Sequence, residues 1–398
     1  MKKTCVMLAA VLLTACLICG CAAPAKDESK QETVSDTPAS AEQPAESSEE
    51  TVNSTEGPFD IVVRDLGVPL GGKYHYNDIS IVPWDMAFCN GKLFVGSGDL
   101  SVNSGPVQMW CYDTYSDKWE LSATLPEEEI SRFYIHEGAL YCPGADSQES
   151  WDWASFYKYE DEWIKYRSIP NASHCFDLAF AEGRIFAAIE NEADTVYWYV
   201  AVSSNSGKSF SVVPLMREGE KVKRTVFLQD VFAIGGDVYA LASEDGKLNL
   251  YKYDGEVFEY ALSWHGKISQ QGMRKYVIQS KAEYNGKFYF TTGRLYECGT
   301  DAEPRLIKMP QTGVVQDIYL NDGVLNIMCV SYNGNAYVMT VYRFADEGNK
   351  TLEKIFEFEY ETTAVSFAAD GENYYFGIAS QDRNDKNNGR IIYVKVNG

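Results

Sequence analysis

The sequence predicts an all-β fold: a seven-bladed β-propeller with four-stranded antiparallel blades. Beyond residue 58 the chain is rich in Tyr, Phe, Val and Ile, in runs of four to eight residues separated by Gly, Asn and Asp, which is typical of strands. A unit of two strands joined by a Gly-containing turn recurs seven times. The two ends of this region also complement each other, as a closed ring of sheets requires.

The chain begins like an export signal. Met1-Lys2-Lys3 is a short positive segment, and the apolar run over 4–19 is too short for a transmembrane helix. Ile18-Cys19-Gly20-Cys21 resembles the lipobox of bacterial lipoproteins, which implies cleavage before Cys21 and lipid attachment to its thiol. Cys16 fits the same pattern, but cleavage there would leave an apolar stub. An ordinary cleaved secretory signal over 1–20 is the alternative.

Residues 21–58 predict a disordered acidic tether. From residue 22 this segment holds nine acidic residues, two lysines and much Ser, Thr, Ala and Pro. Such a composition buries too little apolar surface to offset the entropy of ordering the chain. We therefore expect a folded domain over 59–398, held at the extracytoplasmic face of a bacterial membrane through its lipid alone.

The charge and the cysteine content of the domain argue against two classes of partner, nucleic acid and zinc. The formal net charge is −22, of which the domain carries −17, because the signal contributes +2 and the tether −7. Nucleic acid is an unsuitable partner for such a domain. Its six cysteines are widely spaced, with no Cys-x-x-Cys motif, so zinc is not expected. Most of them lie in apolar runs, which favours free buried thiols.

The first hairpin of each unit is recognised by its turn glycine. Successive turn glycines lie 37 to 53 residues apart, a spacing that matches propeller blades. Asn or Asp often precedes the glycine, which suits a type I′ turn. The glycines are Gly91, Gly138, Gly183, Gly236, Gly286, Gly323 and Gly371.

A second hairpin follows in most units, with an aromatic residue after its turn. Examples are Trp119, Trp163, Phe210 and Phe258. The final unit is one strand short, whereas residues 59–65 form a strand without a unit, so we expect that strand to close the ring and remove an exposed edge. A six-bladed ring is the alternative, because the Gly286 unit is short.

The units resemble kelch-type blades, with an aromatic residue after the turn glycine and Tyr-Asp before Trp in the second hairpin. Residues 203–210, Ser-Ser-Asn-Ser-Gly-Lys-Ser-Phe, are similar to the Asp-box of sialidase-like propellers. The double glycine of kelch is present only at Gly235-Gly236, and the Asp-box is degenerate. In those families the Asp-box is a peripheral structural turn, so the resemblance implies a fold and no particular chemistry.

A polar ring is predicted where the innermost strands begin. The residues six positions before the turn glycines are Asp85, Arg132, Asp177, Asp230, Ser280, Asp317 and Val365, with Lys281 and Ser366 one residue later. Aspartate is disfavoured in strands. One interpretation is a ligand site at the channel mouth, where the carboxylates could also bind a divalent cation. No other cofactor is expected. The other interpretation is that each Asp accepts backbone N–H bonds.

Aromatic and basic residues near the same end extend the candidate site. Trp84 precedes Asp85, and Trp151 and Trp153 lie in a loop of the second unit. His174 precedes the third inner strand, and Arg274 the fifth. Tryptophan beside Asp and Arg suits sugar or peptide binding; the alternative is that these tryptophans belong to blade cores.

Three functions remain open for the domain. A monomeric binding module for a protein, peptide or glycan is favoured, because no nucleophile motif, P-loop or dinucleotide fingerprint is present. A sialidase-like glycoside hydrolase or lyase would use the ring carboxylates, although only Arg132 supplies an arginine at a ring position. A scaffold of the cell envelope would use the blade rims instead.

Overall fold

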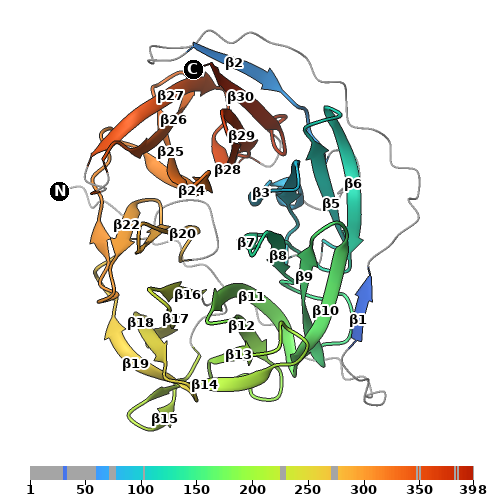
Figure 1. Ribbon diagram of the computed structural model, residues 1–398, viewed down its shortest axis with the longest axis vertical. Helices are drawn as coiled ribbons and strands as arrows, with labels where there is room; N and C mark the ends of the chain where they lie inside the picture. The colour runs from blue at the N-terminus through green and yellow to red at the C-terminus, as the bar shows by residue number, and fades with distance from the viewer. Residues whose placement is uncertain are drawn as a thin grey trace, which may run out of the picture.

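The computed structural model of the chain describes residues 30–33, 60–70, 78–101, 104–224, 230–269, 277–346, 351–380 and 385–397, together with 348 and 382. The sheets stand radially around a central axis, in a β-propeller-like ring (Figure 1). The all-β prediction is confirmed for these residues, whose one helical element is the 3-10 turn η1 (Asp78–Ile81). None of the described helical structure is long or apolar enough to cross a membrane.

Four sheets contain four antiparallel strands each, and successive strands run outwards from the axis (Figure 1). The first is β3 (Asp85–Cys89), β4 (Lys92–Gly96), β5 (Val107–Asp113) and β6 (Lys118–Leu125). Two more are β20 (Ser280–Tyr284), β21 (Lys287–Thr291), β22 (Leu295–Cys298) and β23 (Arg305–Leu306), and β24 (Val314–Asn321), β25 (Val324–Tyr332), β26 (Tyr337–Phe344) and β27 (Leu352–Tyr360).

The fourth of these sheets closes the ring. It consists of β28 (Ala364–Asp370), β29 (Asn373–Ile378), β30 (Ile391–Asn397) and, outermost, β2 (Asp60–Asp65). β2 pairs antiparallel with β30 over six residues, from Asp60↔Asn397 to Asp65↔Ile392. The predicted closure by the first strand of the domain is therefore confirmed.

A fifth sheet has an added strand from the predicted tether. It contains β7 (Tyr134–His136), β8 (Ala139–Pro143), β9 (Trp153–Tyr159) and β10 (Trp163–Pro170), and β1 (Lys30–Thr33) pairs antiparallel with β10. Residues 30–33 of the predicted tether thus form a strand. β10 is an outer strand whose free backbone groups can pair with any extended segment. The export signal, Cys21 and the rest of the tether lie outside the described residues.

The third and fourth predicted units are joined in one nine-stranded sheet. Their outer strands β14 and β19 pair in parallel at Leu215↔Phe258 and Met216↔Glu259. The division into sheets therefore differs from seven separate blades, and also from the six-bladed alternative, because the Gly286 unit forms a sheet of its own. The joined strands are β11 (Ala172–Ala181), β12 (Arg184–Asn191), β13 (Tyr199–Ser203), β14 (Ser211–Arg217), β15 (Glu220–Lys221), β16 (Asp230–Ile234), β17 (Asp237–Glu244), β18 (Lys247–Tyr253) and β19 (Phe258–Ser263).

The predicted turn glycines have the backbone geometry that a tight hairpin requires. Gly286, for example, has φ +69° and follows Asn285 with φ +49°, and the two residues form the two-residue turn between β20 and β21. Two successive positive φ angles define the type I′ turn. Gly371 differs, because it is the first residue of its turn, between Asp370 and Asn373.

The hydrophobic core lies between neighbouring sheets. Phe94 of β4, for example, packs edge-on against Trp163 of β10, with ring centroids 5.5 Å apart. All six cysteines of the domain are free and buried, as predicted. Each sheet therefore covers the face of the next, and the inner strands remain to form the axis.

Candidate functional site: the central cavity

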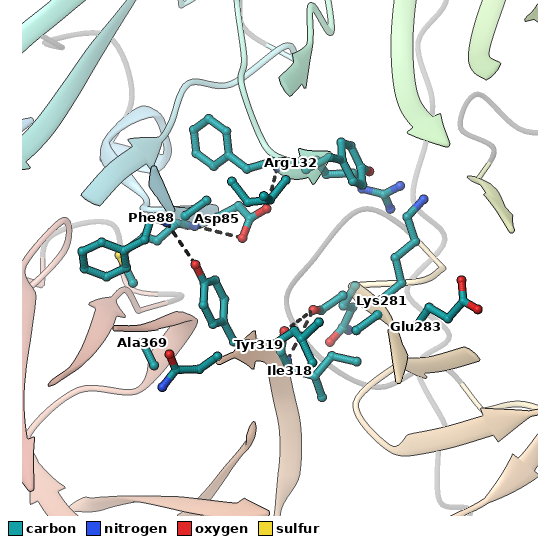
Figure 2. Close-up of a pocket in the computed structure, with 18 of the residues that line it drawn as sticks. Asp85, Phe88, Arg132, Lys281, Glu283, Ile318, Tyr319 and Ala369 are labelled. Atoms are coloured by element: carbon teal, nitrogen blue, oxygen red, sulfur yellow. Dashed lines mark hydrogen bonds between the residues drawn. The ribbon is translucent and has the colours of Figure 1, made fainter. Parts of the chain in front are cut away.

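A cavity of about 600 Å³ lies among the inner strands. Most of its walls come from β3, β7, β20, β24 and β28 or the residues just before them (Figure 2). Phe180 of β11 also lines it, so all six sheets contribute to one space. Asp85, Arg132 and Lys281 lie near the starts of these strands, whereas Asp322 and Asp370 lie at their turns. We call these two sides the ring end and the turn end of the cavity.

Four charged side chains form an ion-pair network at the ring end. Arg132, just before β7, places Nη1 2.9 Å from Asp177 Oδ1 and Nη2 2.6 Å from Asp230 Oδ1. Nη2 also donates to the carbonyl of Ile278 at 2.6 Å. Lys281 Nζ donates to Asp177 Oδ2 at 2.5 Å and to the carbonyl of Val231 at 2.6 Å. The network joins the inner segments of four predicted units.

The network is buried, and this sets its protonation. Asp177 and Asp230 are 0% and 2% exposed. Burial raises the pKa of Asp177, but the charges of Arg132 and Lys281 outweigh it, so its pKa lies below the ordinary value. Burial and the charge of Asp177 raise the pKa of Asp230. Burial lowers the pKa of Lys281. Asp177 is thus the anion that both cations hold in place.

Tyr134 completes the network. Its hydroxyl donates to Asp177 Oδ1, and its ring lies 5.1 Å from Lys281 Nζ. Burial, followed by the charge of Asp177, raises the pKa of Tyr134 well above its ordinary value. The phenol therefore remains a neutral hydrogen-bond donor.

The ring aspartates connect each inner strand to the next sheet. One carboxylate oxygen accepts the N–H of the following residue, and the other accepts a backbone N–H of the neighbouring sheet. Inner strands have a free edge at the axis, and these bonds satisfy part of it. The pairs of donors are Met86 (2.9 Å) and Phe133 (2.8 Å) for Asp85, Leu178 (3.0 Å) and Val231 (2.8 Å) for Asp177, and Ile318 (2.8 Å) and Phe367 (2.9 Å) for Asp317.

Two serines at ring positions also connect neighbouring sheets, and β-bulges precede several ring residues. Ser280 Oγ donates to the carbonyl of Ile318 at 3.0 Å, and Ser366 Oγ donates to that of Pro83 at 2.5 Å. Ser366 rather than Val365 takes the ring position, because Gly371 stands first in its turn. β-Bulges directly before Asp177, Asp317 and Ser366 set the direction of these side chains.

The ring carboxylates are therefore committed to the protein itself. Asp85, Asp177 and Asp317 each use both oxygens on backbone donors, and Asp230 accepts from Arg132 and from the N–H of Ile278 at 3.3 Å. This geometry matches the interpretation of these aspartates as acceptors of backbone N–H bonds. Each of Asp85, Asp177 and Asp317 accepts one N–H from the residue after it and one from the neighbouring sheet.

The predicted tryptophans do not gather at the cavity. Trp84 is buried, packs with Val82, Val365 and Ala379, and donates Nε1–H to the carbonyl of Gly98 at 2.7 Å. Trp153 begins β9 and is partly buried, whereas Trp151, in the loop before it, is 54% exposed. Trp84 thus has a core role, and Trp151 remains available on the surface.

His174 belongs to a separate buried cluster. Its Nε2 lies 3.0 Å from Asp146 Oδ2, its Nδ1 lies 3.3 Å from Glu190 Oε2, and Arg224 pairs with Glu190. Arg274 lies outside the described residues. Within the described ranges, no group of three or more His, Cys, Asp or Glu side chains is arranged to hold a metal ion.

Sequence reasoning missed the residues at the turn end. Ile135 and Leu320 line the cavity while 53% and 45% exposed, and Tyr319 accepts the N–H of Phe88 at 3.0 Å across the wall (Figure 2). Glu283 lies two residues after Lys281, on the same side of β20. The sequence does show apolar residues such as Leu320 near the ends of inner strands. From sequence alone, however, they cannot be distinguished from residues of the hydrophobic core.

Comparison with known proteins identifies no family for this chain. The chain matches no protein-family model and no curated protein. Among solved structures, the computationally designed Ika8 protein is 10% identical, with 81% of this chain and 98% of that chain covered and a TM-score of 0.43. A chain of a mitotic checkpoint complex is 8% identical, with 91% and 97% covered and a TM-score of 0.48.

Proposed function

We propose that this chain is a lipid-anchored, extracytoplasmic binding protein that holds its ligand in the central cavity. One observation carries the proposal: six sheets contribute residues to a cavity of about 600 Å³, within the range of small-molecule sites. The acidic tether and the lipobox-like segment ending at Cys21 support the location. The occupied ring carboxylates weigh against glycoside hydrolysis, which needs an available acid and base.

We also propose that the ring is seven-bladed, with the nine-stranded sheet acting as two blades. The parallel contact between β14 and β19 involves two residue pairs, whereas β11–β14 and β16–β19 are each connected by antiparallel ladders. Native-state hydrogen exchange tests this. An amide proton of Met216 that exchanges no faster than those of the ladders would argue for one cooperative sheet. Leu215 is no probe of this contact, because its N–H donates to the carbonyl of Trp198 at 3.1 Å.

The membrane location is tested by fractionation and lipid labelling. Wild-type protein should partition with membranes and incorporate a fatty-acid label, and a Cys21→Ser variant should lose both. A Cys16→Ser variant is the matched control and should keep both. A Cys21→Ser protein that still incorporates lipid would refute this part of the proposal.

The binding function is tested by thermal shift against short peptides, oligosaccharides and six-carbon amines, alcohols and acids. At least one class should stabilise the wild type. Ala282→Phe, inside the cavity, and Leu320→Trp, at its exposed end, should each remove that effect. Their urea midpoints report whether they still fold. Stabilisation that survives both substitutions would place the ligand elsewhere.

A further inference from the structure

The turn end of the cavity combines exposed apolar side chains with carboxylates. Ile135 and Leu320 are the cavity-lining members of the set of large exposed hydrophobic residues, and Phe88 and Phe180, both partly buried, line the same cavity. Apolar surface left open at a concave site is typical of ligand contact. An apolar body is therefore the expected neighbour of these side chains.

Three carboxylates share this end: Glu283 of β20, Asp322 of the β24–β25 turn and Asp370 at the end of β28. Among the described residues, none of the three carboxylates has an ion-pair or hydrogen-bond partner. They come from three successive sheets, so they lie along one side of the opening (Figure 1). Figure 2 shows Glu283 on the same strand as Lys281, and its side chain is exposed.

Among the described residues, the two cations that line the cavity do not offset these charges. Arg132 and Lys281 are held by Asp177 and Asp230 at the ring end. The ring-end network is thus balanced, and the three carboxylates leave the turn end negative. All three carboxylates are exposed, so salt screens part of their field, but a cation entering there is attracted and an anion is repelled.

We propose that the cavity binds a small organic cation with an apolar body, entering at the turn end. The ammonium group lies among Glu283, Asp322 and Asp370, and the body packs on Ile135 and Leu320. The Arg132 network spans the ring end and sets the depth of the site. This inference rests on the proposed function and names its ligand class.

The test uses isothermal titration of the full chain with hexylammonium, hexanol and hexanoate. Hexylammonium should bind at least tenfold more tightly than hexanol, and hexanoate should bind most weakly. The triple variant Glu283→Gln, Asp322→Asn, Asp370→Asn should weaken hexylammonium binding at least tenfold. It should leave hexanol binding unchanged, since the apolar contacts remain.

The matched control removes three exposed acids that do not line the cavity: Glu162→Gln, Glu256→Gln, Glu259→Gln. It has the same change in net charge and should bind hexylammonium as the wild type does. Equal weakening in both triple variants would overturn the inference, because overall charge would then explain the binding. So would hexanoate binding as tightly as hexylammonium.

The outcomes also separate this inference from the proposed function. If hexanol or hexanoate binds at least as tightly as hexylammonium and Leu320→Trp abolishes that binding, the cavity is a ligand site and only the cationic class is wrong. If Leu320→Trp and Ala282→Phe change the binding of none of the three probes, both proposals fail.

Discussion

Glu127 should make the stability of this protein fall as the pH rises from 5 to 8. Its side chain is fully buried in the connection from β6 to β7. Tyr157 donates a hydrogen bond to Oε1 at 2.8 Å, and a Cβ at Gly144 would lie 2.6 Å from the carboxyl carbon. Burial is the largest influence, and it raises the pKa of Glu127 to about 8.

The sign follows from which state binds the proton. The folded pKa lies above the unfolded value near 4.5, so between these pH values the folded state keeps a proton that the unfolded state releases. The stabilisation is fully present below pH 4.5 and is lost as the pH rises through 8. At about 1.4 kcal/mol per pH unit, the change from pH 5 to 8 is roughly 3–4 kcal/mol.

Urea unfolding at pH 5, 6, 7 and 8, followed by tryptophan fluorescence, measures this effect in the Glu127→Gln variant. Gln is always neutral and can still accept from Tyr157, so the variant should gain roughly 3–4 kcal/mol on the wild type across this range. Glu256→Gln, at an exposed turn, should track the wild type. A constant difference between wild type and Glu127→Gln would refute the reasoning.

Three further predictions concern a ring aspartate, the closing strand and the buried thiols. Asp85→Ala should lower the free energy of unfolding by about 2 kcal/mol or more, because the backbone N–H of Phe133 loses a charged acceptor; an unchanged urea midpoint would contradict this. Deleting Asp60–Asp65 exposes β30 and should produce oligomers in light scattering, whereas a stable monomer would show that closure is dispensable. The six domain thiols should react with a disulfide reagent only after unfolding, because burial raises the pKa of each; rapid reaction in the native state would argue against their burial.

The repeat was predictable from sequence because its signals are local. A turn glycine such as Gly286 needs positive φ whatever surrounds it, and the strand lengths on either side follow from alternation and turn residues. The closure by Asp60–Asp65 followed from counting strands. The joining of β14 to β19 was not predictable, since it depends on two outer edges that meet in space.

The ring positions were predictable, but the roles of their side chains were not. Asp85, Asp177 and Asp230 occupy equivalent places, yet Arg132 pairs with Asp177 and Asp230, whereas Asp85 accepts the N–H of Phe133. Which residues pair with Arg132 depends on the reach of its side chain across the axis. Counting six residues back from Gly371 leads to Val365, one residue before the true ring position at Ser366. The count fails there because Gly371 is the first residue of its turn.

The central claim is that inner strands far apart in sequence meet at one axis, where Arg132 and Asp230 form a buried ion pair. A double-mutant cycle with Arg132→Met and Asp230→Asn, measured by urea unfolding, tests it most directly. The two residues are 98 positions apart and 2.6 Å from contact atom to contact atom, so a coupling energy of about 1–3 kcal/mol is predicted. Additive effects within about 0.5 kcal/mol would show that the two side chains do not meet.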